Sequence, residues 1–371
     1  MKTKFICKHP FEYLDAQEYG LFMCCPSWLP ENIENYRDTE IPNFAESWNN
    51  LTSNKIRQSV IDGSYSFCDE NICPFLNEVI HTKESNEFLL DKDVFLEKYG
   101  DKIIYDENGL VKNYSGGPET IAYGFDRSCN LKCPSCRSET VFNPQKGSET
   151  KHRQEVILKN IEDSFSESVK TLYITGSGDP VYSKLYRNYL QEFDEDKYPN
   201  LESIQLITNG VLLDEKMWSS FKSKKYINTI EISVDAGTKD TYENITRLNG
   251  DWDRVTENIS FLYHQPEIKY MILSMVVSEY NYKEVLAFYD KMMELTKNNY
   301  MSKVLAINYR KIVHWTSGKY SNQDIRNISV FDKAHPLHSD FLEKMKQVID
   351  KDSVDENTPR YVSHNFHREV K

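Results

Sequence analysis

The chain of 371 residues lacks any apolar run long enough to span a bilayer, and its first residues, MKTKFICKHPFEYLD, lack the apolar segment of a signal peptide. It is also short of basic residues, because 45 Lys and Arg stand against 57 Asp and Glu and the net charge is −12. A general nucleic-acid-binding surface needs an excess of positive charge. These absences predict a cytoplasmic protein that binds neither membranes nor nucleic acid.

Cysteine is absent after residue 136, although the chain contains eight. The cysteines form two groups, of five and of three: Cys7, Cys24, Cys25, Cys68 and Cys73, then Cys129, Cys133 and Cys136. Scattered core cysteines are not expected to segregate in this way. In a reducing compartment such grouping indicates metal binding rather than disulfide bonds.

The second group has the spacing Cys-x3-Cys-x2-Cys. Three thiolates this close can face one metal centre, and they are one fewer than the four that iron–sulfur clusters usually take. One iron of such a cluster keeps a position for another ligand. A structural zinc site is the alternative, but it takes a fourth Cys or His, and the nearest downstream histidine, His152, is far from Cys136 in the sequence.

This spacing resembles the signature of the radical S-adenosylmethionine (SAM) enzymes. The resemblance implies that Cys129, Cys133 and Cys136 hold a [4Fe-4S] cluster whose open iron binds the amino and carboxylate groups of SAM. It further implies that the reduced cluster splits SAM into methionine and a 5′-deoxyadenosyl radical. The electron for this step is expected from a donor such as flavodoxin or ferredoxin.

Six short apolar segments alternate with longer helical ones after residue 118, which predicts βαβ units on a parallel sheet. The predicted strands are Thr120–Asp126, Thr171–Thr175, Ser203–Thr208, Thr229–Val234, Tyr270–Val277 and Val304–Ile312. The fold class is therefore α/β, and the resemblance implies a partial (βα)6 radical SAM barrel over residues 119–315. Active sites of such barrels lie at the carboxyl ends of the strands, where the cysteine loop follows the first strand.

Three strand ends carry candidate SAM-binding residues. Ser177-Gly178-Asp179-Pro180 resembles the Gly-Gly-Glu-Pro of the family, which holds the SAM amine. Ser233 and Asp235 resemble its strand end that contacts ribose and carboxylate groups, and Asn209 follows the third strand in a similar place. The alternatives are a plain βα turn at Ser177–Pro180, a helix N-cap at Asp235 and a simple Asn209-Gly210 turn.

One position departs from the family. The residue before the third cysteine is often an aromatic residue that packs on adenine, and here it is Ser135. Val276 and Val277 of the fifth strand are the candidate substitutes for that apolar surface, with an ordinary core role as the alternative.

The first group of cysteines resembles part of a SPASM or twitch module, which carries an auxiliary cluster. Cys7, Cys25, Cys68 and Cys73 would hold one auxiliary [4Fe-4S] cluster without an open site, with Cys24 as the alternative to Cys25. The module usually follows the barrel, whereas here it occupies residues 1–80 and precedes it. A structural zinc site is the competing interpretation.

The remaining ranges are a charged connector at residues 81–118 with little periodicity and, at residues 316–371, a C-terminal helix and polar tail.

Under the enzyme interpretation, an auxiliary cluster that accepts an electron favours net oxidation, by dehydrogenation or crosslinking. The sequence slightly favours a peptide substrate over a sugar or another small molecule. Arg310 and His314, with Asn308 and Trp315, follow the sixth strand and are weak candidates for substrate contact, with a surface-loop role as the alternative. A non-catalytic iron–sulfur or zinc protein is the alternative to an enzyme.

Overall fold

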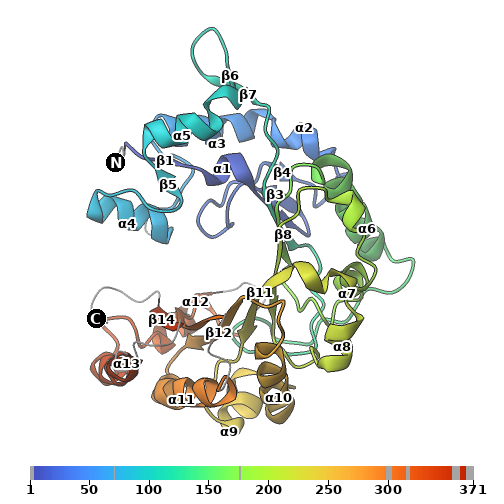
Figure 1. The fold of residues 1–371 in the computed structure, drawn as a ribbon. Helices are drawn as coiled ribbons and strands as arrows, with labels where there is room; N and C mark the ends of the chain where they lie inside the picture. The colour runs from blue at the N-terminus through green and yellow to red at the C-terminus, as the bar shows by residue number, and fades with distance from the viewer. Residues whose placement is uncertain are drawn as a thin grey trace. The chain divides into compact units, whose positions relative to one another are not determined.

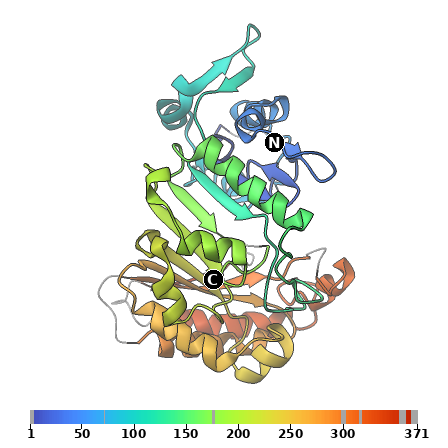
Figure 2. The same ribbon diagram turned by 90° about the vertical axis from the view of Figure 1, so that its right-hand side faces the viewer.

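The computed structural model describes residues 4–70, 72–174, 177–297, 303–314, 318–352 and 360–364, and Figures 1 and 2 trace them from blue to red along the chain. The chain forms two compact units. Unit 1 comprises residues 1–126, 144–174 and 194–202, and unit 2 comprises residues 127–143, 175–193 and 203–371. Each unit is built from three separate segments of the chain. The contiguous domains proposed from the sequence remain a prediction.

The strands of unit 1 are arranged around β8 (Thr120–Gly124). This strand runs parallel to β9 (Thr171–Ile174) on one side and to β2 (Tyr13–Gln17) on the other. Strands β3 (Gly20–Phe22) and β4 (Glu34–Asn35) continue from β2 in antiparallel order. Strands β2 and β3 form a hairpin. Strand β3 lies so close to β4 that a Cβ atom on Gly20 would be 2.9 Å from the Glu34 carbonyl oxygen.

Helix α6 (Glu149–Phe165) belongs to unit 1 and confirms the helix predicted after the cysteine loop. Its N-cap is Ser148, whose hydroxyl accepts a hydrogen bond from a backbone N–H of the first turn. The buried side chains Ile157, Ile161 and Phe165 recur every four residues, as expected for a helix that packs with one apolar face.

The other helices of unit 1 include α1 (His9–Glu12), α2 (Phe44–Trp48), α3 (Leu51–Ile61) and α4 (Pro74–Thr82).

The predicted connector at residues 81–118 contains regular elements, which its lack of periodicity did not indicate. The structure contains β5 (Leu89–Leu90), α5 (Lys92–Tyr99) and a hairpin of β6 (Ile103–Tyr105) and β7 (Val111–Tyr114) in this range. Strand β5 pairs with β1 (Ile6–Cys7). These strands have two to four residues each, which is too short for a two-residue period to be read from the sequence.

Unit 2 contains five parallel strands in the order of the chain: β10 (Ser203–Thr208), β11 (Ile227–Ser233), β12 (Tyr270–Val277), β13 (Val304–Lys311) and β14 (Arg360–His364). The first four confirm the third to sixth predicted strands. Strand β14 corrects the expectation of a simple polar tail, because the backbone of this segment pairs with β13 although its sequence has no apolar run.

The two faces of strand β12 show how this sheet is covered. Met271, Leu273, Met275 and Val277 are fully buried on one face. Figure 1 shows helices α10 (Trp252–Tyr263), α11 (Val285–Leu295) and α13 (His338–Asp352) on one side of these strands. The opposite face carries polar side chains such as Ser274. The α/β class predicted from the sequence is confirmed, and the polar face positions the site described next.

Candidate functional site

The cysteine loop begins a few residues after β8 and folds back on itself. The Cys129 N–H donates to the Val141 carbonyl at 2.8 Å, and the Cys136 N–H donates to the Cys133 carbonyl at 2.9 Å. Cys129 and Cys133 are buried and pack with Leu131, and the half-buried Cys136 lies against them. The loop therefore gathers the three cysteines of the motif into one cluster of side chains.

Two arginines that sequence reasoning missed lie against these thiols. Arg137 Nη2 donates to Cys136 Sγ at 3.4 Å, and Arg247 Nη1 donates to Cys133 Sγ at 3.5 Å. Burial raises the pKa of the Cys133 thiol, and the positive charge of Arg247 opposes that shift. Arg137 also donates to the Ser177 carbonyl, which ties the loop after β9 to the cysteine loop. The only sequence signal was the position of Arg137 directly after the motif.

Asp179 is buried and accepts four hydrogen bonds. Its Oδ1 accepts from the backbone N–H groups of Val181 and Tyr182 at 3.0 Å each. Its Oδ2 accepts from Thr208 Oγ1 and from the Asn209 N–H at 2.8 Å each. A carboxylate offers about four acceptor positions, so Asp179 holds the loops after β9 and β10 together. Its predicted contact with SAM stays a prediction.

Asn209 connects the end of β10 to the cysteine loop. Its Nδ2 donates to Asn130 Oδ1 at 2.9 Å and lies 3.9 Å from Cys129 Sγ. Its Oδ1 accepts from the Val211 N–H at 3.1 Å. The turn depends on Gly210, whose φ of +76° is unfavourable for other residues. The structure therefore brings the predicted residue Asn209 to the first cysteine.

Asp235 lies after β11, near the half-buried Ser233, and is itself buried. Its Oδ2 pairs with Arg247 Nη2 at 2.8 Å, and its Oδ1 accepts from the Val276 N–H at 2.8 Å. Burial raises the pKa of this carboxyl, and Arg247 opposes the shift. The alternative of a helix N-cap at Asp235 is wrong, because the next helix, α9 (Lys239–Thr241), is capped by Thr238.

A pocket of about 310 Å³, partly open to solvent, lies beside Asp235. Its lining comes entirely from unit 2 and consists of Pro134, Ser135, Asp235, Ile245, Thr246, Val276, Ser278, Tyr280, Asn281, Ile312 and Tyr320. Of the two valines predicted to replace the missing aromatic residue, Val276 lines the pocket, whereas Val277 points into the core and is fully buried. The pocket therefore places the side chain of Val276 beside the buried Asp235 carboxylate.

The weak candidates at the end of β13 have different surroundings. Arg310 Nη2 pairs with Glu231 Oε2 at 2.8 Å, and Ser274 Oγ donates to Glu231 Oε1 at 2.6 Å. The buried carboxylate of Glu231, which sequence reasoning missed, therefore orients Arg310 on the polar face of the sheet. His314 is half-buried beyond the strand, and Trp315 lies outside the described residues.

The five N-terminal cysteines lie in unit 1, where a cavity of about 400 Å³ is lined by Cys7, Cys24, Cys68 and Cys73. The same cavity is lined by His9, Pro10, Trp28, Leu29, Val60, Tyr65, Phe75, Leu76, Phe88 and Leu89. Cys24 thus lines this cavity and Cys25 is outside its lining, and the choice between them as a ligand stays a prediction. Burial raises the pKa of these thiols, that of Cys68 to about 12.

None of the eight cysteines forms a disulfide bond. Among the side chains that the structure describes, no three His, Cys, Asp or Glu residues converge closely enough to hold a single metal ion.

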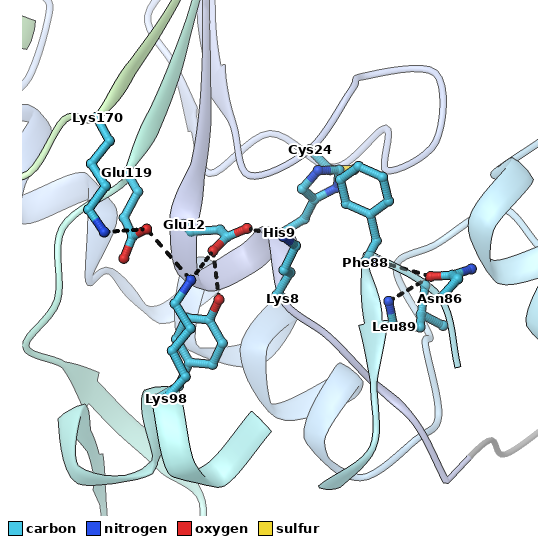
Figure 3. A network of polar contacts seen from close by, with 11 residues as sticks. Lys8, His9, Glu12, Cys24, Asn86, Phe88, Leu89, Lys98, Glu119 and Lys170 are labelled. Carbon is cyan, nitrogen blue, oxygen red and sulfur yellow. Dashed lines mark hydrogen bonds and ion pairs between the residues drawn. The ribbon is translucent and has the colours of Figure 1, made fainter. Parts of the chain in front are cut away.

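His9 Nδ1 lies 3.5 Å from Cys24 Sγ at this cavity, as Figure 3 shows. Burial lowers the pKa of His9 to about 4. Three residues after His9 on the same helix, Glu12 binds two lysines: its carboxylate lies 3.0 Å from Lys8 Nζ and 3.1 Å from Lys98 Nζ. Sequence reasoning missed His9, because one histidine two residues after a cysteine carries no specific signal.

Comparisons with known proteins add to this geometry. Residues 125–292 match the model of the radical SAM superfamily. The GTP 3′,8-cyclase of Petrotoga mobilis (strain DSM 10674 / SJ95) is 29% identical over 154 residues, which cover 40% of this chain and 44% of that protein. The S-adenosylmethionine-dependent nucleotide dehydratase RSAD2 of Oncorhynchus mykiss is 25% identical over 149 residues, covering 38% and 39%. The chain thus spans less than half the length of these relatives.

Two solved structures match at low sequence identity. SuiB of Streptococcus suis is 15% identical with a TM-score of 0.46, and the match covers 99% of this chain and 72% of that one. The protein anSMEcpe with bound AdoMet is 20% identical with a TM-score of 0.44, covering 67% and 63%.

The three-cysteine loop, Arg137, Arg247 and Asp235 all lie in unit 2, within the residues that match the radical SAM superfamily model. This confirms the predicted superfamily, whose enzymes use a [4Fe-4S] cluster and SAM. None of the described helices is long and apolar enough to cross a membrane.

Proposed function

We propose that this protein is a radical SAM enzyme that abstracts a hydrogen atom from its substrate and completes a net oxidation, by dehydrogenation or crosslinking. The observation that carries this proposal is the contact of Arg247 with both Cys133 and Asp235, because it joins the cysteine loop to the pocket within unit 2. Eight cysteines without a disulfide bond fit the reducing conditions of the cytoplasm, where we expect this protein to act.

The residues of unit 2 fit the cluster and SAM. Cys129, Cys133 and Cys136 supply three thiolates. Arg247 Nε is buried and has no hydrogen-bond partner among the described residues, so the site leaves a donor for an acceptor group of the bound cofactor. When bound, the cluster and SAM supply a carbon radical able to abstract hydrogen from an unactivated C–H bond. Asp235 is placed to accept hydrogen bonds from ribose hydroxyls beside the apolar wall at Val276.

The cavity of unit 1 supports net oxidation rather than a redox-neutral reaction. Its four cysteines match the four ligands of a closed [4Fe-4S] cluster, and its volume and apolar walls suit a bulky group. Net oxidation removes two electrons and two protons from the substrate: one hydrogen atom leaves in the abstraction, and one electron and one proton follow. We propose that the cysteines of unit 1 hold the acceptor for that electron. Flavodoxin or ferredoxin is the expected external donor for SAM cleavage.

For the substrate we propose a peptide, since the N-terminal cysteines resemble the module found in enzymes that modify peptides. The second candidate is a nucleotide or another small molecule, which is favoured by sequence relatives that act on GTP and on nucleotides. In both cases Arg310, held by Glu231, is placed to contact the substrate on the polar face of the sheet, with His314 as a weaker candidate.

The test is anaerobic reconstitution, with iron, sulfide and zinc counts and a SAM-cleavage assay, on the wild type and on a variant with Cys129, Cys133 and Cys136 replaced by Ala. We expect about eight irons in the wild type and about four in the variant, with cleavage lost. Zinc retained in the variant would make the N-terminal site structural. No iron and no cleavage in the wild type would overturn the enzyme proposal in favour of a non-catalytic protein.

The substrate class is tested by measuring 5′-deoxyadenosine formation with GTP, with other nucleotides and with a peptide library. Stimulation by peptides together with a peptide lighter by two hydrogens supports the proposal. Stimulation by a nucleotide alone moves it to the second candidate. Substituting Arg310→Ala, with the exposed Arg326→Ala as control, then shows whether Arg310 contributes to substrate affinity.

A further inference from the structure

The imidazole of His9 lines the unit 1 cavity, with Nδ1 at 3.5 Å from Cys24 Sγ. We propose that His9 donates an N–H···S hydrogen bond from Nδ1 to Cys24 and so raises the reduction potential of the cluster held by the cysteines of unit 1. The inference rests on the proposed second cluster and assigns a positioning and tuning residue to it.

Aromatic rings on three sides fix the orientation of His9. The ring centroid of Phe88 lies 4.6 Å from that of His9, and those of Tyr13 and Trp28 lie at 5.1 and 6.4 Å. The Trp28 ring is stacked on the imidazole, with 18° between their planes. A ring held in this way keeps one edge directed at Cys24, as Figure 3 shows.

The loop before β5 holds Phe88 in place. Asn86 Oδ1 accepts from the N–H groups of Phe88 and Leu89 at 3.0 and 2.8 Å. Asn86 Nδ2 donates to the Phe75 carbonyl at 3.0 Å. The Lys8 N–H donates to the Phe88 carbonyl at 2.9 Å, directly before His9. Hydrogen bonds with residues far apart in the chain thus hold the segment that carries Phe88 beside His9.

The far end of α1 is anchored as well. Glu12 accepts from Tyr99 Oη at 2.6 Å and pairs with Lys98, whose Nζ is also 3.6 Å from Glu119. Lys170 completes this chain of ion pairs at 3.1 Å from Glu119 (Figure 3). These ion pairs anchor the end of α1, the helix that begins at His9.

The wall of the unit 1 cavity has few polar side chains. Apart from the cysteines and His9, the described lining residues are aliphatic or aromatic. The Tyr65 hydroxyl among them donates to the Phe5 carbonyl at 2.8 Å and accepts from the Cys7 N–H at 3.0 Å. Hydrogen bonds to the sulfurs raise the potential of a cluster, because reduction adds negative charge, and a wall of low polarity strengthens each such bond.

The experiment uses the full chain with Cys129, Cys133 and Cys136 replaced by Ala, so that only the N-terminal site can hold iron. In this background we compare His9→Phe, which fills the aromatic site without an N–H, with His9→Asn, which keeps a donor near the position of Nδ1. The control is His81→Phe on the exposed face of α4. The measurements are iron and zinc content, the midpoint potential from a redox titration followed by electron paramagnetic resonance, and the nitrogen and exchangeable-proton hyperfine couplings.

We expect about four irons in each variant. In His9→Phe the ratio of reduced to oxidised cluster at a fixed poise should fall about tenfold, equivalent to about 59 mV for one electron. A weak exchangeable-proton coupling should disappear, His9→Asn should restore most of the shift, and His81→Phe should match the background.

Four irons with an unchanged potential would refute the role of His9 alone. Strong nitrogen coupling would make His9 a ligand and overturn the hydrogen-bond assignment. Zinc or no iron in the background would overturn the second cluster and this inference with it.

Discussion

The two cysteine sites of this protein differ in what surrounds their sulfur atoms. In unit 2, guanidinium groups of Arg137 and Arg247 lie within 3.5 Å of two thiols of the motif. In unit 1, the thiols face aromatic and aliphatic side chains and the imidazole of His9. Cations beside thiolates favour a site that also binds an anionic ligand, whereas an apolar wall favours a site closed around its own group.

The buried carboxylates of the two units repeat this contrast. Asp235 in unit 2 is paired with Arg247, which limits the rise of its pKa. Burial raises the pKa of Asp15 in unit 1 to about 7, opposed by hydrogen bonds from Gln17 and Tyr13 and by no cation. Arg247 therefore compensates the charge of Asp235 in unit 2, whereas protonation removes the charge of Asp15 in unit 1. The following predictions test this comparison.

The largest effect is expected at adjacent cysteines. Cys24→Ala should reduce the iron content by about half, from about eight to about four, because it removes one of four ligands from the N-terminal cluster. Cys25→Ala should retain nearly all the iron, since Cys25 is outside the cavity lining. Iron and sulfide counts after anaerobic reconstitution measure both. Iron loss in Cys25→Ala with full retention in Cys24→Ala would restore the ligand set preferred from the sequence.

Replacing Arg247 should lower the free energy of unfolding even when no cluster is bound. Arg247→Leu leaves Asp235 buried without its ion-pair partner, and breaking such a pair costs about 3–5 kcal/mol. The free energy of unfolding in urea of the iron-free protein measures this. Combining Arg247→Leu with Asp235→Asn should recover a large part of the loss, because no charge is then left unpaired. Arg254→Leu, which breaks an exposed pair with Asp214, is the control.

A cost for Arg247→Leu no larger than that of the control would show that the pair does not stabilise unit 2, and the contrast between the units would then rest on the thiols alone.

The sequence predicted what local patterns encode and missed what depends on tertiary contact. Strands β10 and β12 have the predicted bounds: polar and apolar residues alternate in β10, and β12 is mostly apolar. The elements between residues 81 and 118 were missed because the strands have only two to four residues each, and the charged helix α5 buries only Phe95 and Tyr99. Strand β14 was missed because its pairing with β13 comes from the backbone, and its side chains carry no apolar pattern.

The candidate site divides in the same way. Spacing alone indicated the three-cysteine motif, and turn residues indicated Asn209. Arg247 could not be predicted, because it lies more than a hundred residues after Cys133 and reaches it only through the fold. The choice between Cys24 and Cys25 depends on which side of the chain faces the cavity, which neighbours in sequence cannot reveal.

Asp15 should make stability depend on pH. Its folded pKa of about 7 exceeds the ordinary value of 3.8, so the folded state binds more protons between these values. The stabilisation is complete below about pH 4 and is lost as the pH rises to about 7. At about 1.4 kcal/mol per pH unit, the upper limit of the loss is about 4 kcal/mol.

Asp15→Asn removes the titrating group and keeps an acceptor for Gln17. Its unfolding free energy relative to the wild type should therefore rise between pH 5 and 8, as followed by urea denaturation across that range. The exposed Asp38→Asn should show no such trend. A difference that is independent of pH would mean that Asp15 is ionised in the folded protein and has a partner that compensates its charge.

The smallest effect on stability is expected from the hydrogen bond between Tyr99 and Glu12 in unit 1. Tyr99→Phe removes the hydroxyl that donates to Glu12 at 2.6 Å but leaves Lys8 and Lys98 in place. A hydrogen bond of this kind contributes about 1 kcal/mol to folding, so the unfolding free energy should fall by about that amount, against no change for the exposed Tyr105→Phe. Iron content should be unaltered, since the lysines still hold α1. Loss of iron would show that positioning of α1 limits assembly of the N-terminal site, and the two cysteine sites would then be alike in depending on charge.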